Sequence, residues 1–106
     1  MRTQKLFYAL GVTASLAFLP CLTGCGGVLY RVSIFSAESK LETAQALGAE
    51  RYAPYEYWYA HEHLLKAKEE ASSADYGDAI DFADTAEEYA DTAATLSKQA
   101  HGGAGR

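Results

Sequence analysis

Small apolar residues recur along most of the chain at alternating steps of four and three positions. Spacing that averages about 3.5 residues keeps one stripe of a helix against a neighbouring helix. Three stripes of this kind follow one another: Ala37, Leu41, Ala44 and Gly48; Ala60, Leu64, Ala67 and Ala71; and Ala79, Ala83, Ala86, Ala90 and Ala93. The pattern predicts an all-α fold, a short antiparallel three-helix bundle with helices at about residues 29–49, 54–73 and 76–99.

The boundaries of the helices follow from residues that interrupt the pattern. The segment 48–53 ends the first helix, and Pro54 suits the first turn of the second because the N–H that proline lacks has no helical partner there. The segment 72–76 ends the second helix. Asp75 is placed to cap the third helix, and Asp78 lies in its first turn, where the helix dipole favours a negative charge.

The stripes are mostly alanine, which buries little area but lets helix axes approach toward the lower end of the usual range of roughly 8–10 Å. Larger residues at a spacing of seven, Phe82, Tyr89 and Leu96, are expected to close the sides of the third helix. Apolar residues alternate along residues 28–35, so a short strand is an alternative prediction for this segment. A lone strand would lack a partner, so we interpret this segment as the start of the first helix. Residues 100–106 have nothing to bury and are expected to be disordered.

The first residues have the layout of an export signal. Arg2 and Lys5 precede an apolar stretch of 14 residues, 6–19, which is shorter than the roughly 20 residues of a membrane-spanning helix. Residues 1–24 are therefore interpreted as a signal peptide. Two alternatives stay open: an uncleaved helical anchor, and a simple secretory signal followed by a coincidental cysteine.

The segment Leu22-Thr23-Gly24-Cys25 resembles the lipobox of bacterial lipoproteins, in which a branched apolar residue and two small residues precede a cysteine. The resemblance implies that a signal peptidase recognises Leu22, Thr23 and Gly24. It also implies that Cys25 becomes the first residue of the mature protein and carries acyl chains that insert into a lipid bilayer.

The residues after Cys25 extend this interpretation. Gly26 and Gly27 predict a flexible lipidated tether over residues 25–28, followed by an alanine-rich helical domain at 29–99. Gly26 also stands where an aspartate would retain an enterobacterial lipoprotein in the inner membrane. The resemblance therefore favours the outer membrane of a bacterial cell envelope.

Composition excludes several functions. Between Cys25 and Arg106 lie all 14 acidic residues but only seven of the nine Lys and Arg residues, a formal charge of −7. An acidic surface argues against nucleic-acid binding, which needs a basic footprint. With Cys21 removed and Cys25 acylated, no thiol remains for redox chemistry. The sequence has no nucleophile elbow and no Gly-rich phosphate loop, so we expect neither an enzyme nor a cofactor.

Two polar segments contain residue types that can bind a metal or a partner. His61-Glu62-His63 suggests a metal, but residues two apart on a helix project about 200° from each other and cannot chelate together. We therefore expect no metal there. Nine acids and no Lys or Arg lie from Glu69 to Asp91. A solvated helix face is the expected explanation, with a basic partner or weak divalent-cation binding as alternatives.

The densest aromatic cluster begins the second predicted helix. Its members are Tyr52, Tyr55, Tyr57, Trp58 and Tyr59. At about 1.5 Å per helical residue, the cluster should lie on the order of 25–30 Å from Cys25 and face away from the membrane. It serves either as packing at the end of the bundle or as a docking surface for an envelope protein or a glycan, because Tyr and Trp favour interfaces.

Tyr52-Ala53-Pro54, Glu56, the alanines of the second and third stripes, and Asp75-Tyr76 together resemble an alanine-rich domain of unknown function found in small bacterial envelope lipoproteins. The resemblance covers about residues 37–96, and part of it matches a tetratricopeptide hairpin. The expected function is a non-enzymatic, membrane-anchored module that binds or scaffolds an envelope protein or a second copy. The alternatives are a spacer without a specific partner and an accessory subunit of an envelope enzyme or transport complex.

Overall fold

The three stripes fold into three long helices, whose ends differ from the predicted positions by up to five residues. The computed structural model describes residues 25–104, which form α2 (Cys25–Ala46), α3 (Ala49–Tyr52), α4 (Pro54–Ser72) and α5 (Tyr76–Ala104). Within this part of the chain there is no strand. The all-α prediction is confirmed.

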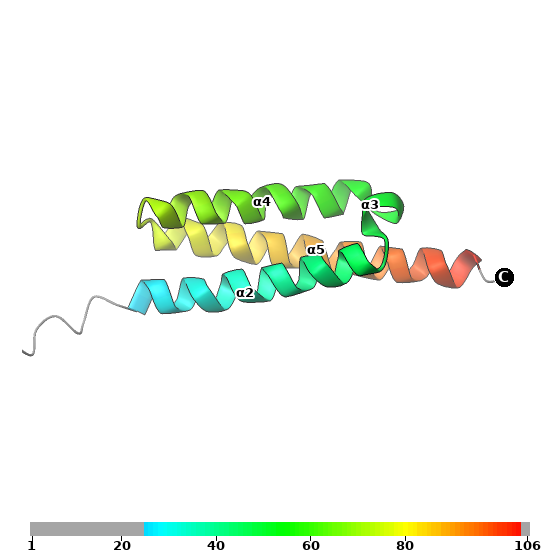
Figure 1. Cartoon of the computed structure of the whole chain (residues 1–106), viewed down its shortest axis with the longest axis horizontal. Coiled ribbons are helices and arrows are strands. Elements are labelled where there is room, and N and C mark those ends of the chain that lie inside the picture. Colours follow the sequence, from blue (N-terminus) through cyan, green and yellow to red (C-terminus); the bar gives the residue numbers. More distant parts are fainter. Residues whose placement is uncertain (1–24, 105–106) are drawn as a thin grey trace, which may run out of the picture.

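The three long helices lie side by side, and α3 is a single turn at one corner (Figure 1). α2 and α5 run in the same direction, and α4 runs antiparallel to both (Figure 1). A Cβ atom built on Gly26 would lie 3.3 Å from the Cβ of Tyr76, so the first turns of α2 and α5 are in contact. At the opposite end, α5 continues past the corner formed by α3 (Figure 1).

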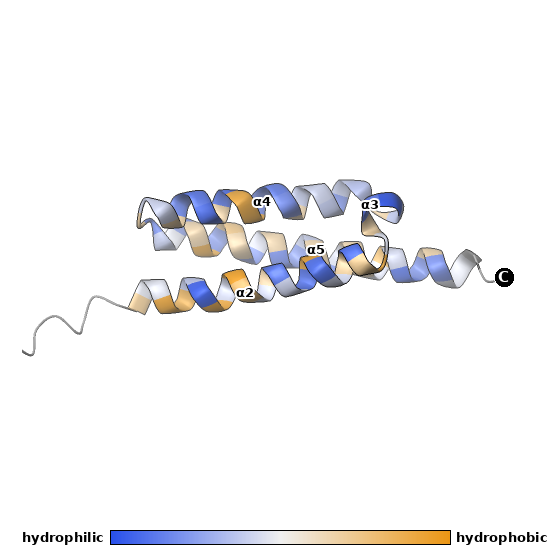
Figure 2. Cartoon of the chain, in the orientation of Figure 1, coloured by the Kyte–Doolittle hydropathy of each residue, from blue (hydrophilic) through white to orange (hydrophobic). Residues whose placement is uncertain are grey.

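The core is a narrow column of small side chains, here named the alanine seam. Its residues are Ala37, Ala44, Ala60, Ala67, Ala79, Ala83, Ala86, Ala90 and Ala93, all at most 1% exposed. Leu41, Leu64 and Tyr57 are also buried and add bulk beside the seam. Because alanine has only a methyl group, the helices can pack closely without large interdigitating side chains. Hydrophobic and hydrophilic residues are interspersed along the three long helices (Figure 2).

The residues that end the helices act as predicted. Gly48 adopts the left-handed conformation with φ 80°, which glycine tolerates because it has no Cβ. Pro54 is the first residue of α4. The Oδ1 atom of Asp75 accepts the N–H of Asp78 at 3.4 Å, and the Asp75 carbonyl accepts the N–H of Ala79 at 3.0 Å. Asp75 is therefore the N-cap of α5.

The start of α2 differs from the prediction. The helix begins at Cys25, so residues 25–28 are not a flexible tether. Two glycines are poor helix formers, but the Tyr76 side chain packs across them, 3.7 Å from the Cβ position of Gly27. Residues 28–35 are helical, and the prediction of a helix in place of a strand is confirmed. The first helix ends at Ala46, three residues before the predicted position.

The end of α5 also differs from the prediction, because the helix continues to Ala104 instead of becoming disordered after residue 99. The Nε2 atom of His101 lies 2.9 Å from the carbonyl oxygen of Leu47, and its ring lies edge-on to Tyr52 with centroids 4.8 Å apart. These contacts hold the last turns against the corner at α3. Residues 105–106 lie outside the described part.

Two ion pairs connect α2 with the other long helices. Lys40 on α2 donates to Asp91 on α5 at 2.9 Å, and Lys68 on α4 lies 2.7 Å from Glu38 on α2. Both pairs are solvent-exposed, so their contribution to stability is small compared with that of the buried seam.

Candidate anchor and docking surfaces

The candidate anchor, Cys25, is a free and exposed cysteine at the first position of α2. The residues predicted to direct its modification, Leu22, Thr23 and Gly24, lie outside the described residues. Among residues 25–104 there is no helix with the length and hydropathy needed to cross a bilayer.

The predicted aromatic cluster lies at the other end of α2, around α3 and the start of α4 (Figure 1). The structure divides its five members into three groups with different surroundings. Tyr52 is half-exposed, lies next to His101, and carries the Arg51 guanidinium 5.6 Å above its ring. This first group closes the corner between α3 and α5.

Tyr57 is not available to a partner, which corrects its inclusion in a docking surface. Its side chain is only 4% exposed and belongs to the core cluster. Burial raises the pKa of its hydroxyl above the ordinary value, and a hydrogen bond to the Glu50 carboxylate acts in the same direction. Tyr57 therefore packs the end of the bundle, as the alternative interpretation of the cluster proposed.

Trp58 lies next to Tyr57 but faces outward, with 48% of its surface exposed. Its ring meets Tyr57 edge-on with centroids 5.0 Å apart and His61 edge-on at 5.3 Å. Tyr57 and His61 thus contact the indole, while about half of its surface stays in solvent. Trp and Tyr are enriched among the residues that contribute most to binding at protein interfaces.

The third group joins α4 to α5. Tyr55 is 65% exposed and stacks on Tyr59 with centroids 5.7 Å apart, and Tyr59 lies 4.2 Å from Tyr89 on α5. Burial raises the pKa of Tyr89, with Tyr59 and Tyr55 adding to the effect. Tyr89 was predicted only to close the side of its helix. Its spacing of seven from Phe82 indicated which face it occupies, but not that it would meet Tyr59.

His61 and His63, the two histidines of α4, contact different neighbours. The Nδ1 atom of His63 lies 2.9 Å from the Tyr59 carbonyl oxygen, and its ring stacks on that of Tyr59 with centroids 4.1 Å apart. His61 instead contacts Trp58. Each imidazole thus extends a different aromatic group.

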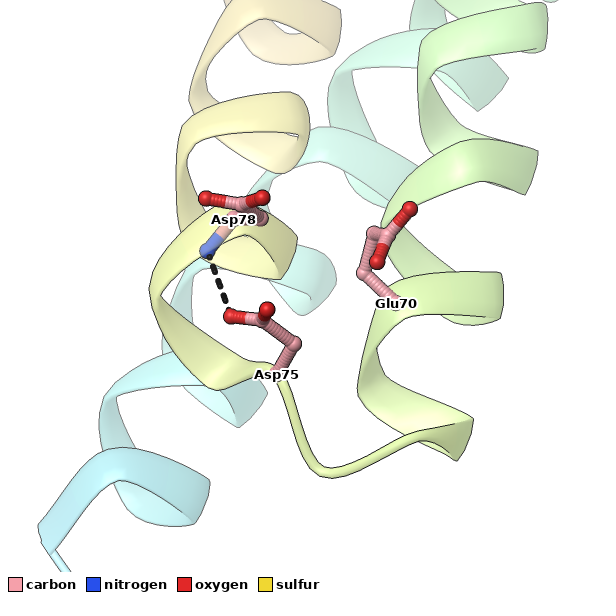
Figure 3. Close-up of side chains that lie close together, drawn as sticks. All are labelled: Glu70, Asp75 and Asp78. Carbon is pink, nitrogen blue, oxygen red and sulfur yellow. Dashed lines mark hydrogen bonds between the residues drawn. The ribbon is translucent and has the colours of Figure 1, made fainter.

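Three carboxylates gather at the Cys25 end of the bundle, where α4 turns into α5 (Figure 3). Oxygen atoms of Glu70, Asp75 and Asp78 lie within 4.8 Å of one another. Asp75 is occupied as the N-cap of α5, and Glu70 accepts a hydrogen bond from Lys66 at 2.9 Å. The cluster is thus accounted for by helix capping and an ion pair on the surface.

The described residues define the class of protein: an all-α bundle of three long helices with an alanine core. Residues 33–102 match the family described as "Domain of unknown function (DUF4398)", and the chain belongs to this family. The predicted membership of an uncharacterised domain family is confirmed, and the domain extends beyond the predicted 37–96 at both ends. Comparison with curated proteins and with solved structures finds no match.

Proposed function

We propose that this protein is a lipid-anchored lipoprotein of the bacterial cell envelope whose helical bundle serves as a non-enzymatic module that binds or scaffolds an envelope protein. The anchor is assigned to Cys25, because Leu22-Thr23-Gly24 precede it as in a lipobox. The observation that carries the proposal is that Cys25, at the start of α2, and the exposed side chains of Tyr55 and Trp58, near the start of α4, lie at opposite ends of one bundle (Figure 1).

This arrangement separates attachment from recognition. The 22 residues of α2 span about 33 Å at 1.5 Å per residue. Tyr55 and Trp58 are exposed at the far end and are backed by Tyr59 and Tyr57. Tyr and Trp contribute more to protein interfaces than most residues, because their rings bury a large area with few rotatable bonds. A lipid at the near end leaves these side chains free for a partner.

The acidic residues support a binding role better than a catalytic one. Asp81, Asp84 and Glu88 are exposed on α5. Catalytic carboxylates are typically placed in clefts where burial and neighbouring charges alter their pKa. Solvated carboxylates on a helix instead keep the bundle soluble and favour basic partner surfaces.

The anchor is tested by producing the full chain in a bacterium and measuring the mass of the purified protein. We expect cleavage before Cys25 and the added mass of acyl chains, with the Cys25→Ser variant lost from the membrane fraction. A purified protein that retains residues 1–24, or carries no lipid, would contradict the anchor.

The docking surface is tested by cross-linking in native membranes. The double variant Tyr55→Ala/Trp58→Ala should lose its cross-linked partner while its thermal unfolding stays close to that of the wild type, because both side chains are exposed. Leu65→Ala is the matched control, because Leu65 is also 48% exposed on α4 but lies outside the aromatic groups. Unchanged cross-linking in the double variant would favour a spacer, or an accessory subunit that docks through another face.

A further inference from the structure

A second exposed apolar surface lies on the first three turns of α2. Val28 is 65% exposed, Val32 65% and Phe35 73%, and Leu29 at the edge is 60% exposed. We name this group the outer face of α2. Hydrophobic colour accordingly reaches the outer edge of the helix near its start (Figure 2). Side chains of this size are unusual in such a cluster on a protein surface unless something covers them.

The outer face points directly away from the rest of the bundle. Nine residues separate Val28 from the buried Ala37, which is about two and a half turns at 3.6 residues per turn. The two residues therefore lie on opposite sides of α2. Since Ala37 packs into the alanine seam, no other helix of the described part can reach Val28 and its neighbours.

Cys25 belongs to the same surface. Steps of three, four and three residues connect Cys25, Val28, Val32 and Phe35, so all four lie on one side of the helix. The side chain of Cys25 is exposed there. Acyl chains attached to its sulfur would leave the helix on the side that carries the apolar residues.

Charge changes along α2 with distance from Cys25. Arg31, which is exposed, is the only charged residue from Cys25 to Ala37, and the first acid is Glu38. Farther along, the outer side of the helix carries Ser39 and Glu42, both exposed. The apolar surface is thus confined to the turns nearest the anchor, and its single charge has the sign that lipid phosphates attract.

We propose that the outer face of α2 lies in the interfacial region of the bilayer that holds the acyl chains of Cys25. The inference rests on the proposed lipid anchor and specifies how the anchored bundle is oriented. Helices that lie in the interface place their apolar side roughly 5–10 Å into the boundary between headgroups and acyl chains. The start of α2 then lies between the membrane surface and the other two long helices, α4 and α5. The bundle lies against the membrane and does not stand upright on a tether.

A second copy of the chain fits this surface less well than lipid does. A standard protein interface uses roughly 20–30 residues from each partner. The outer face offers four apolar side chains over three turns and is followed by polar residues. A bilayer needs no matching partner surface and is present wherever Cys25 is acylated.

The test places a single tryptophan on α2 of the full chain, purified from bacterial membranes. The protein is reconstituted into vesicles of phosphatidylethanolamine and phosphatidylglycerol, with or without bromine atoms on the acyl chains. Trp58→Phe removes the native tryptophan. Val32→Trp then reports from the outer face, and Glu42→Trp reports from the same side of the helix beyond it.

We expect brominated lipids to quench Val32→Trp several-fold more strongly than Glu42→Trp. Equal, weak quenching of both would overturn the inference, and strong quenching of both would overturn its restriction to the turns near Cys25. Thermal unfolding of each variant verifies that the bundle is intact. If Val32→Trp alone unfolds, Phe35→Trp supplies the same reading.

Two further measurements separate this inference from the proposed anchor. A mass spectrum without acyl chains, together with quenched Val32→Trp, would overturn the anchor and support the membrane-facing surface. Acyl chains with an unquenched reporter would overturn the surface alone. Sedimentation of the Cys25→Ser chain measures whether the protein forms a dimer in solution. A dimer that dissociates when Val32→Asp is added would assign the outer face to self-association and overturn the inference.

Discussion

The Nε2 atom of His101 lies 2.9 Å from the carbonyl oxygen of Leu47, and this contact joins the last turns of α5 to the end of α2. We predict that His101→Ala loosens residues 98–104, although alanine is the better helix former. The lost hydrogen bond should cost about 1 kcal/mol. Hydrogen exchange should accelerate at the amides of this segment, with Gln99→Ala, at an exposed position two residues away on another side of the helix, as the control. Unchanged exchange in His101→Ala would show that the helix needs no such contact.

A second prediction concerns the left-handed conformation of Gly48. Its φ is 80°, and a Cβ atom there would lie 3.2 Å from the ring of Tyr52. Gly48→Ala should therefore lower the free energy of unfolding by about 1–2 kcal/mol. Gly102→Ala is the opposite case, because Gly102 is helical and has nothing within 4 Å of its Cβ position. This control should be neutral or stabilising by up to about 1 kcal/mol in urea unfolding.

A third prediction tests the close packing of the alanine seam. Ala90 is 0% exposed, so the extra atoms of leucine have no space unless α5 moves away from its neighbours. Ala90→Leu should cost about 1–3 kcal/mol, the usual cost of overpacking a core. Ala46→Leu makes the same change at an exposed position on α2 and should alter urea unfolding little. Equal stabilities of the two variants would mean that the seam is looser than the structure indicates.

A fourth prediction concerns alkaline pH. Burial, aided by the Glu50 carboxylate, raises the pKa of Tyr57 above 10.0. The folded state therefore favours the neutral phenol, and this contribution to stability is complete below about pH 10 and is lost as the pH rises through the raised pKa. Tyr57→Phe removes the ionisable group and should show a shallower decline of stability above pH 10.

The comparison of Tyr57→Phe with the wild type at two pH values provides the control. At pH 7 the variant should be less stable by up to about 1 kcal/mol, because it loses the polar group that faces the Glu50 carboxylate. The difference should shrink or reverse at alkaline pH when urea unfolding is repeated there. A constant difference across the whole range would show that ionisation of Tyr57 does not affect folding.

The helices and their buried faces could be predicted from the sequence, because alanine spacing depends on local periodicity. The same rule could have placed Tyr57 in the core. Tyr57 precedes Ala60 by three residues and follows Ala53 by four, so it continues the second stripe toward the start of its helix, and all three are buried. The exposed Tyr55 and Trp58 flank that stripe. Extending the second stripe back to Ala53 therefore distinguishes the buried Tyr57 from the exposed Tyr55 and Trp58.

The remaining differences depend on contacts between distant parts of the chain. Gly26 and Gly27 have low helix propensity, and the side chain that packs across them belongs to Tyr76, fifty residues later. The last turns of α5 likewise depend on a carbonyl oxygen at Leu47. Tyr89 joins the aromatic groups through Tyr59, thirty residues earlier. No local pattern contains these pairings, because they follow from the relative placement of the helices.

The parallel course of α2 and α5 has a mechanical consequence. Both helices start at the Cys25 end and run toward the aromatic end, and they are packed along their length (Figure 1). Tension between Cys25 and the start of α4 would pass along α2 and α3, and the successive layers of the seam would support α2 along its length. A sideways pull would open the layers one after another. A protein held by lipid at one end and by a partner at the other would therefore be strongest along its own axis.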